Sequence, residues 1–429
     1  MDHQEGKIFW GWYVVGGAFL LMAFSHGARY CFGLFVQPLT VENGWSRSVV
    51  SLAASINLFV YALGGIGSGK LLDRIAPRWI ATAGALVGAA GFFLCTRVSS
   101  PLGLYAAYGL LCGLGSSWTG SITMNTSVGK WFDRKRGLAI GISSMGISFG
   151  TIILTTTTGY ILEHFPWEAG FCFLGAIMLF PGIAISQTML RRTVPEAYGL
   201  MPDGEPSAVG GPRPVLLHDQ PIGSASPAAI YVQRDLRFWT IALCHGTAVM
   251  TSLLTFVHQV PYAVENGIEK IAAAGSLAAI GFSGLIGQLF FGWISDRIGD
   301  PKYSAALGYL FMAAGMAILL QAMTVEALFC YAVVFGFGFG CLGPLLPILT
   351  ADRFGRRHMG AIFGMLNLFV VGIGGFLGPL VGGLIYDSTG SYRHAWGLNL
   401  SLLILMAAAI LTLKRDPVSG LQRDPSRNP

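Results

Sequence analysis

An arginine in the first apolar stretch of the chain is the residue best suited to chemistry. Arg29 lies within residues 11–39, which are almost entirely apolar and long enough to cross a bilayer as one helix. His26 and Tyr30 share its helical face, because positions i, i+3 and i+4 are neighbours on a helix. A charge inside the hydrocarbon costs roughly 3 kcal/mol or more. We therefore expect Arg29 to bind an anion, since its planar guanidinium matches both oxygens of a carboxylate. The alternative is an arginine that snorkels to the outer headgroups.

Five further polar side chains are candidates for the same site. Asn57 and Tyr61 share one helical face at i and i+4, and Asn125, His258 and Asn367 lie in later apolar stretches. Polar groups within a bilayer need partners, so each of these residues could instead bond across helices for packing alone. His258 has a second alternative, because it lies near the end of its stretch and could be interfacial.

The sequence lacks the groups that several other chemistries need. No Asp or Glu lies deep in an apolar stretch, so His26 is the best remaining candidate for a proton carrier. The seven cysteines form no CxxC pair, and no cluster of nucleophile and base or of metal ligands is present. No GxxxxGK[ST] loop is found, so ATP is not expected to drive the protein. We predict no enzymatic activity, no cofactor and no metal.

The composition indicates a membrane protein. Hydrophobic residues make up 53% of the chain and charged residues 11%, with a mean hydropathy of +0.61, whereas soluble domains carry roughly 25% charged residues. We predict an all-α membrane protein with twelve transmembrane helices in two pseudo-symmetric six-helix halves. The predicted spans are residues 11–38, 47–69, 79–97, 102–127, 137–162, 168–190, 238–262, 272–294, 303–322, 327–349, 360–386 and 394–413.

The positive charges predict the orientation of these spans. Twenty-two of the 27 Lys and Arg residues fall at the termini and in the even-numbered connections, and four fall in the odd-numbered ones. The positive-inside rule then places both termini in the cytoplasm. The net positive charge of the chain therefore reflects the membrane topology and contact with anionic lipid, and it does not indicate binding to nucleic acid.

One long connection, rich in Pro, Gly and Ser, divides the chain. We expect a first half at residues 1–192, a cytoplasmic linker at 193–235, a second half at 236–416 and a cytoplasmic tail at 417–429. The halves repeat each other with one offset of 223 residues, which relates Gly137 to Gly360. Repeated halves with substrate bound midway between them are a transporter design.

Two loop motifs carry a resemblance that extends over the whole chain. The hexapeptides GKLLDR and GWISDR end at Arg74 and Arg297, and their aspartates, Asp73 and Asp296, are also 223 residues apart. They resemble the cytoplasmic signature of the major facilitator superfamily. The resemblance implies that these four residues form a cytoplasmic gate, in which the aspartates receive helix N-termini and arginines of the opposite half. The alternative is a set of loop charges that follow the positive-inside rule.

Within that superfamily the chain resembles the monocarboxylate transporter family and its bacterial relatives. Residues 11–25 and the stretch WFDRKRGLAIGISSMGISFG at 131–150 carry this resemblance. Members of the family have a cation in the outer half of their first helix, and Arg29 is at or one residue from that place. They often have an arginine in helix 8 as well, whereas residues 271–296 contain no Arg, Lys or Glu.

We therefore predict a secondary active transporter that moves a small organic anion, above all a monocarboxylate, together with a proton or in exchange for another anion. Two alternatives remain open: an exporter of amphipathic or drug-like compounds, and a non-transporting membrane sensor. We expect a monomer in the plasma membrane. Short external loops without an N-x-S/T sequon favour a bacterial inner membrane.

Overall fold

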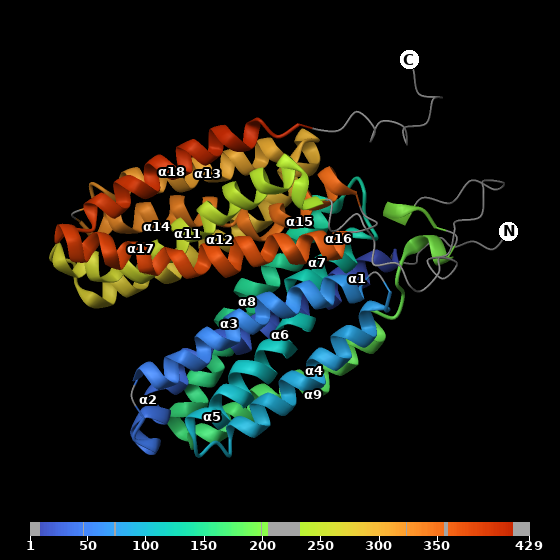
Figure 1. The fold of residues 1–429 in the computed structure, drawn as a ribbon, viewed down its shortest axis with the longest axis horizontal. Coiled ribbons are helices and arrows are strands. Elements are labelled where there is room, and N and C mark those ends of the chain that lie inside the picture. The colour runs from blue at the N-terminus through green and yellow to red at the C-terminus, as the bar shows by residue number, and fades with distance from the viewer. Residues whose placement is uncertain are drawn as a thin grey trace.

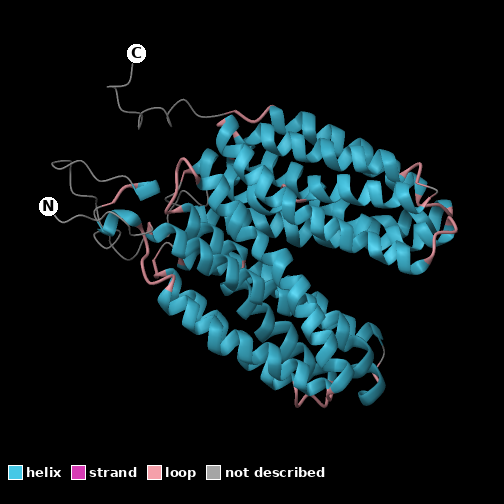
Figure 2. Ribbon diagram, turned by 180° about the vertical axis from the view of Figure 1, so that it is seen from behind, coloured by secondary structure: helices cyan, strands magenta, loops and turns pink. Residues whose placement is uncertain are grey.

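The chain folds into two helical bundles. The computed structural model describes residues 9–45, 47–72, 74–198, 200–204, 232–322, 324–355 and 359–414. Helices dominate this part of the chain (Figure 2). The first bundle contains α1 to α9, and the second contains α11 to α18 (Figure 1).

The first bundle is built mainly from long apolar helices. Its elements are α1 (Trp10–Tyr30), α2 (Phe32–Asn43), α3 (Arg47–Leu71), α4 (Pro77–Cys95), α5 (Pro101–Leu104), the π-helix η1 (Tyr105–Cys112), α6 (Gly113–Thr119), α7 (Ser121–Gly129), α8 (Arg136–His164) and α9 (Trp167–Thr188).

The second bundle repeats this pattern after a connection, whose described residues form three short 3₁₀ turns. The turns are η2 (Pro195–Tyr198), η3 (Pro202–Gly204) and η4 (Val232–Arg234). The bundle consists of α11 (Leu236–Glu265), α12 (Lys270–Ile298), α13 (Pro301–Leu319), α14 (Val325–Phe339), α15 (Leu342–Phe354), α16 (Met359–Asn367), the π-helix η5 (Leu368–Ile373), α17 (Gly374–Thr389) and α18 (Arg393–Leu411).

Eleven helices of the described residues are long and apolar enough to cross a membrane. The twelfth predicted span, residues 102–127, is a helical stretch from Pro101 to Gly129 whose geometry changes along its length. It passes through the π-helix η1 and then breaks at Gly120, where φ is −90° and ψ is −164°. The prediction of an all-α membrane protein is confirmed, and the fourth span is an interrupted helix.

The two bundles meet at one end of the molecule and diverge toward the other (Figure 1). We call the meeting end the terminal end, because α1 begins and α18 ends there. Glycines make this close approach possible, since small residues let helix backbones touch. A Cβ on Gly69 would collide with the carbonyl oxygen of Gly360, and a Cβ on Gly137 with that of Gly292. Both crossings obey the 223-residue offset, so the repeat in the sequence is also a repeat in packing.

Candidate functional site

Arg29 lies near the end of α1 and contacts two tyrosine rings. Its guanidinium carbon is 4.4 Å from the centroid of the Tyr61 ring on α3 and 5.4 Å from that of Tyr30. Tyr61 is buried, whereas Tyr30 is 51% exposed. The face of an aromatic ring attracts a cation, so both rings partly compensate the charge without neutralising it.

The guanidinium retains an unused donor. Nη1 of Arg29 is buried and has no hydrogen-bond partner among the described residues. The backbone around it is held in place, because the Tyr108 hydroxyl donates to the Arg29 carbonyl oxygen at 3.0 Å. A buried donor on a positive charge is costly to leave unpaired, so this position favours an incoming anion.

His26 lies one turn before Arg29 and contacts the break in the fourth span. Its Nε2 is 3.4 Å from the Tyr61 hydroxyl and 3.3 Å from the Ser121 hydroxyl. Gly120 precedes Ser121 and lets these rings come close: a Cβ there would lie 3.0 Å from the Tyr61 ring and 3.4 Å from the His26 ring. We call Arg29, His26, Tyr61 and Ser121 the Arg29 cluster.

The break itself is stabilised from α1. Ser25 donates from its hydroxyl to the Ser116 carbonyl oxygen at 3.2 Å, one turn before Gly120. A carbonyl freed at a helix break needs such a partner, because no water is available in hydrocarbon. The interrupted fourth span is thus tied to the helix that carries Arg29.

The structure places the other candidate residues outside this cluster. The Asn57 side-chain amide donates to the carbonyl oxygen of Tyr108 in η1 at 2.9 Å, so it provides a hydrogen-bond partner for a backbone group of the π-helix. Asn125 accepts from the Ser143 hydroxyl at 3.1 Å between α7 and α8. These contacts give both residues partners for helix packing.

The two candidates in the second bundle have different surroundings. His258 lies on α11, with its Nδ1 3.3 Å from the Tyr392 hydroxyl. Asn367 ends α16, and its side-chain nitrogen is buried without a partner among the described residues. Of the two, Asn367 is the one with an unused polar group.

Sequence reasoning missed Tyr108 and favoured a packing role for Ser121. Tyr108 lies in η1, and its importance depends on the packing that brings its hydroxyl to the Arg29 carbonyl oxygen. Ser121 is one of several serines and threonines in the fourth span, and its value depends on the break at Gly120. That break places its hydroxyl at the start of α7, beside His26.

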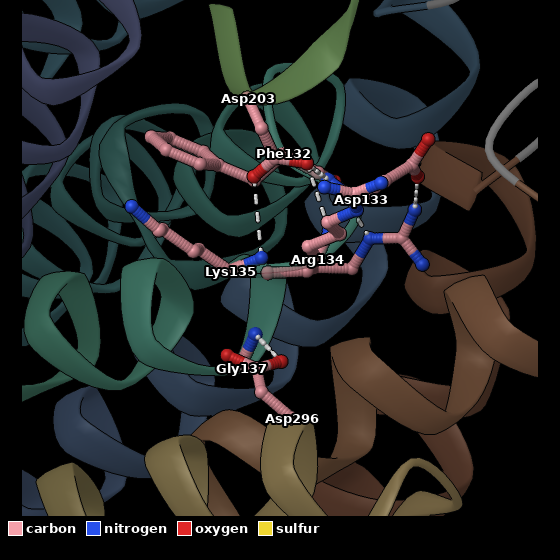
Figure 3. Close-up of polar contacts among 8 residues, drawn as sticks. Phe132, Asp133, Arg134, Lys135, Gly137, Asp203 and Asp296 are labelled. Atoms are coloured by element: carbon pink, nitrogen blue, oxygen red, sulfur yellow. Dashed lines mark hydrogen bonds and ion pairs between the residues drawn. The ribbon is translucent and has the colours of Figure 1, made fainter.

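The predicted gate lies at the terminal end, where Asp296 joins the bundles. Its carboxylate accepts a hydrogen bond from the backbone N–H group of Gly137 at 2.6 Å (Figure 3). It accepts a second one from the N–H group of Leu138 at 2.8 Å. These groups belong to the first turn of α8, where backbone donors lack intrahelical partners and the helix dipole favours an anion. Arg297 is exposed and lies over the Trp293 ring at 5.2 Å.

The equivalent gate residues of the first bundle are only partly described. Arg74 is exposed after α3. Asp73 lies outside the described residues. Further from the terminal end, the Gln288 amide of α12 donates to the Ser148 hydroxyl of α8 at 3.2 Å, which is another hydrogen bond between the bundles.

The fold and these residues define a class of protein. The family model "Major Facilitator Superfamily" matches residues 18–379, and the chain belongs to this superfamily. Two solved structures share its fold: the proton:xylose symporter XylE, with a TM-score of 0.72 at 13% identity over 94% of this chain and 96% of that one, and the E. coli fucose:proton symporter FucP, with a TM-score of 0.67 at 17% identity over 94% and 100%.

Relatives in sequence narrow the class further. The chain is 26% identical to monocarboxylate transporter 12-B of Danio rerio, over 98% of this chain and 90% of the relative. It is 24% identical to monocarboxylate transporter 2 of Homo sapiens, over 94% and 85%. The protein is therefore a membrane transporter of the monocarboxylate transporter type, and this resemblance, expected from residues 11–25 and 131–150, is confirmed.

Proposed function

We propose that the protein is a secondary active transporter of a small monocarboxylate and that Arg29 is the ligand of the carboxylate. The observation that carries this proposal is the buried and unpartnered Nη1 of Arg29. A carboxylate would accept from this donor and also compensate a charge that Tyr61 only partly offsets. The names of the relatives, which are monocarboxylate transporters, support the same substrate class.

The rest of the Arg29 cluster and two residues outside it, Tyr30 and Asn367, have separate roles in this proposal. The Tyr61 ring and the Ser121 hydroxyl position His26 and limit where an anion can lie. Tyr30 is half exposed and provides an aromatic wall for the organic part of the substrate. Asn367 is the candidate contact from the second bundle, because its side-chain nitrogen has no partner among the described residues.

We propose that transport proceeds by alternating access. In this structure the bundles touch at the terminal end through Asp296 and the glycine crossings, and they diverge at the opposite end. The excess of Lys and Arg at the termini and in the even-numbered connections supports a cytoplasmic location for the terminal end. The conformation would then be the outward-facing one, in the plasma membrane of a bacterium.

Uptake into proteoliposomes tests the proposed function. We expect labelled lactate, pyruvate or benzoate to accumulate in vesicles that contain the protein, driven by a proton gradient or by an internal anion, and not in empty vesicles. Export of amphipathic dyes without any carboxylate uptake would replace the proposal by the exporter alternative. Specific binding without uptake of any of the three acids would favour a sensor.

Replacement of His26 tests how transport is coupled. A carboxylate on Arg29 offsets the repulsion between the guanidinium and a proton on His26, so anion and proton should favour each other's binding. We expect His26→Gln to lose uptake driven by a pH gradient and to retain counterflow of substrate. His164→Gln, an exposed histidine at the end of α8, is the matched control. If His26→Gln and the parent share one pH dependence, His26 carries no proton and anion exchange becomes the better account.

A further inference from the structure

A carboxylate from the connection between the bundles holds the loop that precedes α8. Asp203 accepts hydrogen bonds from three successive backbone N–H groups: Asp133 at 2.9 Å, Arg134 at 2.8 Å and Lys135 at 3.2 Å (Figure 3). Its own N–H donates to the carbonyl oxygen of Trp131 at 3.0 Å. These four bonds fix the connection and the loop to each other.

The backbone adopts an unfavourable conformation to make this contact. Asp203 has a φ of 63°, and among the described residues it is the one non-glycine residue with positive φ. Residues other than glycine rarely adopt a positive φ, and Asp and Asn are among those that tolerate it best. The next residue, Gly204, packs against the Phe9 ring, where a Cβ would lie only 2.9 Å away. Phe9 in turn packs edge-to-face on Trp131 at 5.6 Å.

The loop held by Asp203 leads directly into the contact between the bundles. Arg136 follows the three N–H groups and folds back on the loop, donating from Nε to the Phe132 carbonyl oxygen at 3.0 Å and pairing with Asp133. The next two N–H groups, those of Gly137 and Leu138, donate to Asp296 of the second bundle. Figure 3 shows Asp203 and Asp296 on opposite sides of this one turn of chain.

We propose that Asp203 is a positioning residue for closure of the terminal end. It holds residues 133–135 in the conformation that directs the N–H groups of Gly137 and Leu138 toward Asp296. The connection between the bundles thus stabilises the gate indirectly. It holds the loop of the first bundle, and Asp203 itself does not bond to Asp296. A role of Asp203 in transport rests on the proposed alternating access. The positioning of residues 133–135 by Asp203 does not, because it is a property of the protein without substrate.

A physical argument explains why such a residue is needed. The first backbone N–H groups of a helix have no intrahelical acceptors, and this loop carries several basic side chains at an exposed surface. Without an acceptor, the N–H groups before α8 would bond to water and the first turn would fray. Asp296 binds two adjacent N–H groups at once, so it requires that turn to be ordered.

Hydrogen–deuterium exchange at single-amide resolution tests the proposal on the full-length protein in nanodiscs. Asp203→Asn keeps the shape and the tolerance of positive φ but removes the charge and one acceptor. Charge-assisted hydrogen bonds are stronger than neutral ones, so we expect exchange at residues 133–135 to accelerate at least about tenfold. The proposal further requires accelerated exchange at Gly137 and Leu138, although neither bonds to Asp203.

Two comparison variants make the result specific. Asp296→Asn should accelerate exchange at Gly137 and Leu138 and leave residues 133–135 unchanged. Asp387→Asn removes the same charge from an exposed position in α17 and should change neither set. Asp203→Glu, with the same charge on a longer side chain, should restore part of the protection.

The outcomes separate the inference from the proposed function. If Asp203→Asn accelerates exchange at residues 133–135 alone, Asp203 is a local cap and the positioning role is overturned. Slower exchange at Gly137 and Leu138 would also overturn it, because repulsion between the two carboxylates would then dominate. No substrate is present in this experiment, so failure of carboxylate transport would leave its result unaffected.

Discussion

Arg29→Gln is expected to abolish binding of the carboxylate while the protein still folds and inserts into the membrane. The guanidinium has a buried Nη1 without a partner among the described residues, so the variant removes the charged donor that we propose binds the substrate. A carboxylate that enters the altered site would be desolvated without a counter-charge. Breaking a buried charge pair in this way costs roughly 3 kcal/mol or more, which corresponds to a loss in affinity of more than about a hundredfold.

Arg29→Lys separates charge from geometry. Lysine keeps the positive charge, but it has a single donor group and lacks the planar fork that matches two carboxylate oxygens. We expect weak binding that is stronger than in Arg29→Gln and weaker than in the parent. Isothermal calorimetry on purified protein gives the three affinities.

A second arginine supplies the control for Arg29. Arg97 lies after α4 and is exposed, so Arg97→Gln makes the same chemical change outside the cluster. It should bind carboxylates with parental affinity. If Arg29→Gln also keeps parental affinity, Arg29 snorkels or stabilises the fold, and the exporter alternative gains support.

Gly292→Ala is expected to slow transport at least about tenfold and to spare substrate binding. α12 crosses α8 at this residue, and an added Cβ would collide with the carbonyl oxygen of Gly137 and lie 3.0 Å from the Cα of Gly141. Neither backbone can move aside without separating the bundles at the terminal end. The closed terminal end would be destabilised, so the protein would complete fewer cycles while its Arg29 cluster stays intact.

Gly281→Ala makes the same change in the same helix without a steric consequence. A Cβ at Gly281 meets nothing within 4 Å. Alanine is favoured over glycine in a helix by about 1 kcal/mol, so this variant should be at least as stable as the parent. Initial rates of uptake compare the two variants, and equal rates would show that the glycine crossing has no part in transport.

Much of the fold could be predicted because its signals are local or repeated. Long apolar stretches predict spans, and the offset of 223 residues predicts two similar halves. The same repeat relates the crossing of Gly69 with Gly360 to the crossing of Gly292 with Gly137. The break at Gly120 was not predictable in the same way. Glycine is common in membrane helices for close packing, so one glycine does not reveal where a helix will be interrupted.

The candidate site was predictable to a smaller extent. The shared face of His26 and Arg29 follows from helical spacing, and the partner Tyr61 was found because it is polar within an apolar stretch. Asn57 has the same sequence signal, yet its amide bonds to backbone in η1. Only the tertiary packing distinguishes these two residues. Asp203 has no signal at all, because it lies in an irregular connection and its partners are backbone groups about 70 residues away.

The most direct test of the central claim compares an acid with its own amide in parent and variant. Calorimetry would use the tightest binder among lactate, pyruvate and benzoate, together with lactamide, pyruvamide or benzamide as its neutral counterpart. If Arg29 binds the carboxylate, the parent should prefer the acid by more than about a hundredfold, and this preference should collapse in Arg29→Gln. If the preference for the acid is equally large in Arg29→Gln, another group binds the carboxylate and the proposed role of Arg29 is wrong.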